Sequence, residues 1–299
     1  MSLNRGLLYA FAAYAWWGFF PLYWKLLIKV PALQLIGHRI IWSFISLISV
    51  LLILNQWNSF RKSIFDFKIF KIYLLAAVLI GLNWFMYVWA VNAGYIVETS
   101  LGYFINPLIS VLLGVLFFKE KLKLWQWIPI ILAGSGVLYM TISIGELPWI
   151  ALLLAFTFGF YGMIKKIAPL SSLQGLTLET VILLLPALFY LIQAENSGVG
   201  AFTHQGLFTD FLIVLAGVIT TIPLLLFASA AKRIPLSYIG VLQYIAPTIQ
   251  FLLGVLVFKE SFSVNQFIGF SAVWIALIIF GLNSFASYRA KSISPPEMD

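Results

Sequence analysis

The sequence predicts an all-α integral membrane protein with about ten transmembrane helices, arranged as two inverted repeats of five helices each. Three observations predict this fold class: the composition, the number of long apolar runs, and an internal duplication. Of the 299 residues, 62% are hydrophobic and only 9% are charged. A soluble chain carries about 25% charged residues, because its surface must face water. Most of the surface of this chain must therefore face hydrocarbon.

The charges and the missing residue types exclude several other classes of protein. The net charge is +8, but the basic residues stand in short clusters between apolar runs, which is typical of membrane proteins and not of nucleic-acid binding. The chain has no cysteine, so it forms neither disulfides nor thiolate metal sites. Its two histidines, His38 and His204, lie far apart, and no P-loop motif is present. We expect no metal and no cofactor.

The apolar runs give the predicted helices. A transmembrane helix needs about 20 mostly apolar residues. The aromatic-rich run from Gly6 to Trp24 lacks a small-residue cleavage site at its end, so we predict a permanent first helix and not a signal peptide. The predicted helices span residues 5–24, 33–55, 70–92, 98–118, 124–143, 148–164, 174–193, 208–231, 236–258 and 263–286.

The basic residues predict the orientation. Because the number of crossings is even, both termini lie on the same side of the membrane. Of the 18 Lys and Arg residues, this topology places four on the other side, so the remaining 14 lie on the side of the termini. An excess of Lys and Arg marks the cytoplasmic side, so we expect both termini in the cytoplasm. The four exceptions are Lys25, Lys29, Arg39 and Lys259.

The chain contains an internal duplication. Residues 103–120 read YFINPLISVLLGVLFFKE and residues 243–260 read QYIAPTIQFLLGVLVFKE, and they align without a gap and are identical at 11 of 18 positions. The shared proline, glycine and Lys-Glu positions make a coincidence of composition a poor explanation. We expect a first repeat over residues 1–145, a second over 146–288, and a cytoplasmic tail over 289–299.

The odd number of helices in each repeat predicts the relative orientation of the repeats, and this orientation indicates a function. A second copy that begins after five crossings must insert with the opposite orientation. Inverted repeats recur in secondary transporters, in which the two halves exchange conformations and open a central site to either side. The sequence therefore predicts a secondary transporter that works by alternating access.

Four segments point to a family. They are Gly37-His38-Arg39-Ile40-Ile41-Trp42-Ser43, the run ETSLGYFINPL at 98–108, the run GVITTIPLL at 217–225, and QYIAPT at 243–248. From about residue 5 to about residue 285 the chain resembles the EamA repeats of the drug/metabolite transporter superfamily, and within it the RarD-type branch. The resemblance implies a multi-pass permease of the bacterial cell membrane, and an exporter more than an importer. Its implied solutes are amino acids, aromatic metabolites or drugs such as chloramphenicol.

Two prolines predict where a solute site lies. A proline leaves the carbonyl four residues before it without its usual helical donor, and within hydrocarbon such a carbonyl needs another polar partner. Pro107 and Pro247 lie near the middle of the fourth and ninth predicted helices. Each shares a helical face with polar residues, which are Tyr103 and Ser110 in the first repeat and Gln243 and Gln250 in the second. We expect these two stripes to face each other and to line a polar cavity, the alternative being prolines that only kink helices for packing.

Three charged residues fall inside or at the edge of predicted helices. The alignment that pairs Tyr103 with Gln243 also pairs Arg39 with Glu179, so the repeat places these two at equivalent positions in opposite leaflets, and Glu98 opens the fourth helix. A charge near the bilayer centre costs at least about 2.5–3.5 kcal/mol, so function is the first interpretation. We predict that Arg39 and Glu179 flank the site, one towards each face, and that the two glutamates make proton coupling possible. The alternatives are snorkelling at helix ends or a structural ion pair.

Four further residues complete the predicted site. They are Trp42, Asn83, Asn106 and Tyr244. Asn106 is expected to face inward near Tyr103, whereas an amide such as that of Asn83 also joins helices without binding a ligand. Tryptophans on the inner faces predict a cavity suited to flat or aromatic solutes, and the further candidates are Trp17, Trp84 and Trp89.

Two other functional classes compete with a transporter, and we do not expect the first, an enzyme. An intramembrane enzyme requires a nucleophile, metal ligands or paired carboxylates at one depth, and no such group is recognisable. A lipid scramblase is harder to exclude: an open groove facing lipid favours it, whereas an enclosed polar cavity favours a solute carrier. The fifth and tenth helices, at the ends of the repeats, are candidate surfaces for a homodimer.

Overall fold

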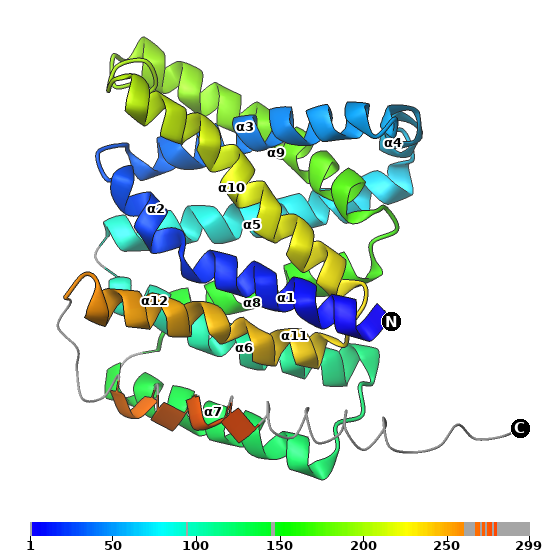
Figure 1. Ribbon diagram of the computed structural model, residues 1–299, viewed down its shortest axis with the longest axis vertical. Helices are drawn as coiled ribbons and strands as arrows, with labels where there is room; N and C mark the ends of the chain where they lie inside the picture. Colours follow the sequence, from blue (N-terminus) through cyan, green and yellow to red (C-terminus); the bar gives the residue numbers. More distant parts are fainter. Residues whose placement is uncertain are drawn as a thin grey trace, which may run out of the picture.

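The described part of the molecule is entirely helical. The computed structural model describes residues 2–93, 95–144 and 147–259, followed by the short stretches 267–269, 271–272, 274–276 and 278–279 (Figure 1). The helices are α1 (Ser2–Gly18), α2 (Phe20–Leu26), α3 (Ala32–Ile53), α4 (Trp57–Ile64), α5 (Phe67–Asn92), α6 (Ile96–Phe118), α7 (Leu124–Ile144), α8 (Trp149–Ile167), α9 (Ser172–Asn196), α10 (Leu207–Ala231), α11 (Leu236–Gln243) and α12 (Ile245–Leu256).

The helices follow the predicted spans with two interruptions. Seven spans of the described residues are long and apolar enough to cross a membrane, namely α3, α5, α6, α8, α9, α10 and the pair α11 and α12. The predicted span 5–24 is divided into α1 and α2, and Pro21 stands in the first turn of α2, where a proline fits. The predicted span 236–258 is divided at Tyr244, three residues before Pro247. Most of the predicted span 263–286 and the tail 289–299 lie outside the described residues.

The predicted repeat is visible as matching helices. Helices α3 and α9 begin at Ala32 and Ser172, which the alignment of the two repeats makes equivalent, and the same offset relates α5 to α10 and α6 to α11. Even a local detail is repeated: Lys119 after α6 and Lys259 after α12 both have left-handed backbone conformations, with φ of 51° and 57°. The partner of Lys259 in the duplicated motif, Glu260, lies outside the described residues.

Two pairs of equivalent helices are in direct contact. Helix α3 packs against α9, and α6 packs against α11. A helix that touches its own counterpart must lie on the axis that relates the two repeats, so these pairs mark the pseudo-twofold axis. In the second pair, Gly240 allows the close approach, because a Cβ there would lie 2.6 Å from the carbonyl oxygen of Pro107. The Tyr244 hydroxyl donates a hydrogen bond to the carbonyl of Phe104, its own equivalent, at 3.1 Å.

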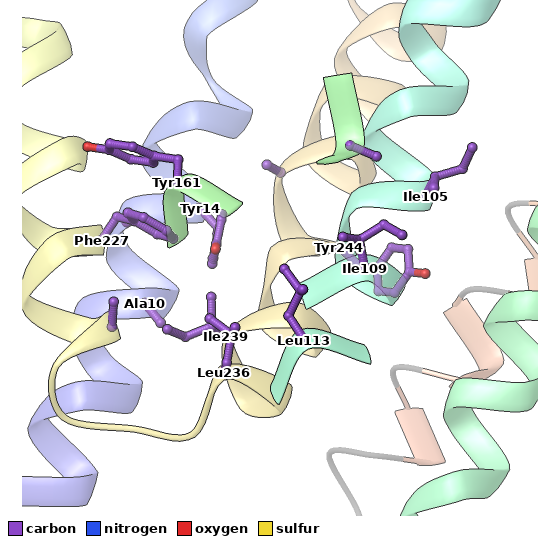
Figure 2. Packing of buried hydrophobic residues seen from close by; sticks show 14 of the residues in the cluster. Ala10, Tyr14, Ile105, Ile109, Leu113, Tyr161, Phe227, Leu236, Ile239 and Tyr244 are labelled. Atoms are coloured by element: carbon purple, nitrogen blue, oxygen red, sulfur yellow. The ribbon is translucent and has the colours of Figure 1, made fainter. Parts of the chain in front are cut away.

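The largest hydrophobic core fills the middle of the bundle on the side of the N-terminus. Figure 2 shows its aromatic part, where Tyr14 of α1, Tyr161 of α8 and Phe227 of α10 converge, next to side chains of α6 and α11. The Tyr161 and Phe227 rings stack with their centroids 6.0 Å apart, and all three side chains are almost fully buried. Aromatic rings bury much apolar surface and have few rotamers, so these three side chains fill the space between the two repeats. We call Tyr14, Tyr161 and Phe227 the aromatic plug.

A polar network joins the helix ends next to this core, at the face that carries the N-terminus. Lys165 of α8 and Glu179 of α9 form an ion pair at 2.6 Å, and the Tyr161 hydroxyl donates to the same carboxylate at 3.0 Å. Both charged side chains are only 1% exposed. Nearby, the Glu120 carboxylate accepts hydrogen bonds from the backbone N–H groups of the first two residues of α11, at 2.7 and 3.0 Å, which caps that helix.

A close helix crossing joins α3 to α10 and predicts a stability effect. A Cβ at Gly217 would lie 2.4 Å from the backbone carbon of Trp42, and the Ser43 hydroxyl donates to the Gly217 carbonyl at 3.0 Å. We expect Gly217→Ala to force the helices apart and to destabilise the purified protein by about 1–3 kcal/mol. The measurement is the melting temperature in detergent, followed by size-exclusion chromatography. Gly134→Ala is the control, because its Cβ would meet only one side chain at 4.0 Å.

The buried ion pair predicts that substitutions of its two residues have non-additive effects on the free energy of unfolding. Glu179→Met or Lys165→Met alone leaves one buried charged group without its partner, at a cost of about 3–5 kcal/mol. The double change to Lys165→Met and Glu179→Met removes both charges, so we expect it to cost much less than the sum. Thermal unfolding of the four proteins gives the coupling. Glu195→Gln is the control, because its pair with His204 is exposed; additive effects of the two buried changes would contradict the account.

Candidate functional site

A cavity of about 210 Å³ lies between the two repeats. Its walls come from α1, α2, α3, α5, α6, α8, α10, α11 and α12. Seven of the residues predicted for the site line it, namely Arg39, Asn83, Tyr103, Asn106, Gln243, Pro247 and Gln250. Tyr103 and Gln243 are equivalent positions of the two repeats, so the cavity takes matching residues from both halves. The structure thus brings together most of the residues that the sequence predicted for the site from the two proline-containing helices and from Arg39.

The cavity is offset from the middle of the bundle, away from the N-terminus. Its walls include the turn from α1 into α2, the second turn of α3 and the first two turns of α6. All of these lie towards the face where α2 ends and α3 begins (Figure 1). Towards the opposite face, Tyr14 and Phe158 form the cavity wall, and behind them lie Tyr161 and Phe227 and then the Lys165–Glu179 ion pair. One end of the space between the repeats is therefore packed and the other is hollow.

Arg39 is the one charged side chain among the described residues of the cavity wall. Its Nε donates to the Thr220 hydroxyl of α10 at 3.1 Å. Its guanidinium carbon lies 4.7 Å from the ring centre of Trp84 and 5.2 Å from that of Trp24, which are cation–π distances. Within the described part of the chain, no carboxylate lies within ion-pair distance of it. The indoles and the threonine fix the guanidinium, and no described carboxylate pairs with its charge.

Other polar groups of the wall are held by neighbouring helices. The Ser110 hydroxyl donates to the Gln243 amide oxygen at 3.4 Å, across the pseudo-twofold axis. The Gln250 amide donates to the Trp17 carbonyl at 3.1 Å. The Asn83 amide donates to the Leu154 carbonyl at 2.9 Å, so it joins α5 to α8 as well as facing the cavity. These bonds orient side chains without using all of their donors and acceptors.

Two wall residues carry buried polar atoms that have no hydrogen-bond partner among the described residues. They are the hydroxyl of Tyr14 and the amide oxygen of Asn106. The side chains are 1% and 5% exposed, respectively. An unsatisfied buried polar atom costs about 1–3 kcal/mol, so such atoms beside a cavity are suited to water or a polar solute. The cavity therefore combines aromatic surface with polar groups that are free to bind.

Four predicted site residues lie outside the cavity walls. Pro107 and Tyr244 lie in the contact between α6 and α11, because the two helices meet there on the axis. Trp42 is turned towards Phe202, with ring centres 6.0 Å apart. Glu179 is paired with Lys165, as in the alternative interpretation of a structural ion pair. The side chain of Glu98 lies outside the described residues.

Several wall residues were not predicted from the sequence. Trp24, Tyr14, Phe158 and Thr220 all line the cavity. Thr220 is 181 residues from Arg39, and no local pattern connects the two. Trp17 and Trp84 were candidates and do line the cavity, whereas Trp89 packs against Tyr95 with ring centres 5.9 Å apart.

Comparison with known proteins agrees with the fold and the repeat. The model of the EamA-like transporter family matches residues 4–142 and 148–282, which are the two halves of the chain. A solved crystal structure superposes with a TM-score of 0.69 at 15% identity, covering 93% of this chain and 97% of that one. At this identity the likeness concerns the fold alone.

Relatives of similar length are named as transporters or as RarD proteins. The chain is 46% identical to the uncharacterized transporter YojE of Bacillus subtilis, over 96% of this chain and 97% of that protein. It is 42% identical to the RarD protein of Streptomyces exfoliatus, over 96% of this chain and 91% of that protein. The chain belongs to the EamA-like transporter family, and within it to the RarD-type permeases.

Proposed function

We propose that this transporter moves small polar organic solutes across the cell membrane by alternating access of its two repeats. The observation that carries the proposal is the cavity between the repeats, because Tyr103 of α6 and its equivalent Gln243 of α11 both line it. A site built from equivalent residues of two inverted halves is suited to open to one side and then to the other. Helices from both repeats surround it, which favours a solute carrier over a scramblase with a groove facing lipid.

The size of the cavity limits the solute. Its volume is about 210 Å³. Pockets for drug-sized ligands are larger, at about 300–1,000 Å³. The cavity therefore favours a metabolite of the size of an amino acid over a large drug. Its aromatic walls, which include Trp17, Trp84 and Phe158, favour a solute with an apolar or flat part.

The charge distribution supports an outward-facing conformation. The N-terminal face carries the clusters of lysine and arginine that mark a cytoplasmic surface. The cavity lies towards the other face, and the aromatic plug and the Lys165–Glu179 pair close the cytoplasmic side. Opening to the cytoplasm would then separate α8 from α9 and expose this pair. Protonation of Glu179 at that step is our proposal for coupling to a proton gradient, and a pH dependence of counterflow tests it.

Counterflow tests the proposed transport function. Purified protein in liposomes is loaded with unlabelled amino acids or aromatic metabolites, and the uptake of the labelled compound is followed. We expect saturable accumulation that falls at least about 10-fold in Gln243→Ala, because the solute loses a polar partner in the cavity. Gln174→Ala is the matched control, because Gln174 bonds to Gln56 at 3.4 Å and does not line the cavity.

Two outcomes would contradict the proposal. Unchanged counterflow in Gln243→Ala would remove the cavity from the solute path. No counterflow of any compound, together with rapid movement of a fluorescent lipid between leaflets, would support a scramblase instead.

A further inference from the structure

We propose that the cavity selects small organic solutes that carry a carboxylate, and that Arg39 binds this carboxylate. The inference rests on the proposed transport function and specifies its substrate class. The solute it describes has one carboxylate, a hydrogen-bond donor close to it, and an apolar or aromatic body.

The charge of the cavity wall is the first argument. Among the described residues, Arg39 is the one charged group that lines the cavity, and it forms no ion pair. An arginine cannot lose its proton under ordinary conditions, so the described part of the wall carries one positive charge in a medium that solvates charge poorly. A carboxylate of the solute pairs with that charge. A solute without a carboxylate does not pair with it.

The second argument is how the guanidinium is held. Its Nε is bonded to Thr220, and Trp24 and Trp84 pack against its faces. Neither Nη atom has a hydrogen-bond partner in the described part of the protein. A guanidinium presents its N–H groups as a planar fork that matches both oxygens of a carboxylate. Because the side chain is already fixed by its neighbours, a carboxylate binds it with little further loss of freedom.

The unpartnered polar atoms add a second anchor. The amide oxygen of Asn106 accepts a hydrogen bond, so it suits an amino or hydroxyl group of the solute. The Tyr14 hydroxyl, also without a partner, is able to donate or accept. Rings of Trp17 and Phe158, whose centres are 6.0 Å apart, supply apolar surface in the same cavity. A carboxylate, a donor and an apolar body are the features of an amino acid or hydroxy acid with an apolar side chain.

Matched pairs of probes test the substrate class. Each carboxylate is compared with its carboxamide, which has nearly the same shape: 3-phenylpropanoate, L-phenylalanine and L-leucine, each with its amide. Uptake into liposomes and thermal stabilisation of the full-length protein are measured for both members of every pair. We expect the carboxylate to be preferred at least about 10-fold by the unmodified protein.

Substitution of Arg39 tests whether this residue causes the preference for carboxylates. We expect the ratio of carboxylate uptake to carboxamide uptake to fall to about 1 in Arg39→Gln. The ratio should be partly retained in Arg39→Lys, which keeps the positive charge but not the planar set of N–H donors. Arg233→Gln is the matched control, because Arg233 also contacts a ring, that of Tyr9 at 5.3 Å, but lies outside the cavity. The readout is a ratio between two probes, so a general loss of stability or activity does not move it. If Arg39→Gln does not fold, the ratios in the unmodified and Arg39→Lys proteins decide.

The outcomes separate this inference from the proposed function. Uptake of amides at the rate of carboxylates, or an unchanged ratio in Arg39→Gln, would overturn the selection of carboxylates while leaving a solute carrier in place. If no probe is transported or stabilises the protein, and lipid moves between leaflets, both the inference and the proposed function fail.

Discussion

The contact between α6 and α11 at the pseudo-twofold axis is the constraint on which the rest of the structure depends. Within hydrocarbon every backbone polar group needs a partner inside the protein, and Pro107 and Pro247 each deprive a carbonyl of its helical donor. The two helices meet where Gly240 lies against the carbonyl of Pro107 and the Tyr244 hydroxyl bonds to Phe104. Helix α11 ends at the same place, and polar side chains next to this break line the cavity. The prolines that interrupt the helical hydrogen bonds therefore lie beside the polar space between the repeats.

The two repeats have related sequences but different surroundings, and this difference suggests how the protein works. Arg39 and Glu179 are equivalent positions, yet Arg39 faces a cavity and pairs with no described carboxylate, whereas Glu179 is buried in an ion pair with Lys165. One side of the axis is hollow and the other is packed with Tyr14, Tyr161 and Phe227. In an inverted-repeat transporter, such asymmetry is expected of one of two exchanging conformations. The buried ion pair then belongs to the closed side.

Much of the architecture was predictable, because the constant offset between the two repeats relates α3 to α9, α5 to α10 and α6 to α11. The same offset singled out Tyr103, Gln243 and Gln250, which line the cavity. The partners of the charges were not predictable, since Lys165 and Thr220 reach Glu179 and Arg39 only through tertiary packing. Nor was the turn of Trp42 towards Phe202, because lipid and protein interior are both apolar and hydropathy does not distinguish the faces of a transmembrane helix.

The central claim is that solute occupies the cavity from one side of the membrane, and site-directed labelling tests it directly. The chain has no cysteine, so a single Ala246→Cys reports on the cavity wall, and Ala13→Cys in the neighbouring core is the control. A membrane-impermeant thiol reagent is applied to right-side-out and inside-out vesicles. The account predicts that Ala246→Cys reacts faster from outside, that a transported solute slows this reaction, and that Ala13→Cys stays unreactive. Equal reactivity of the two cysteines, or no protection by the solute, would contradict it.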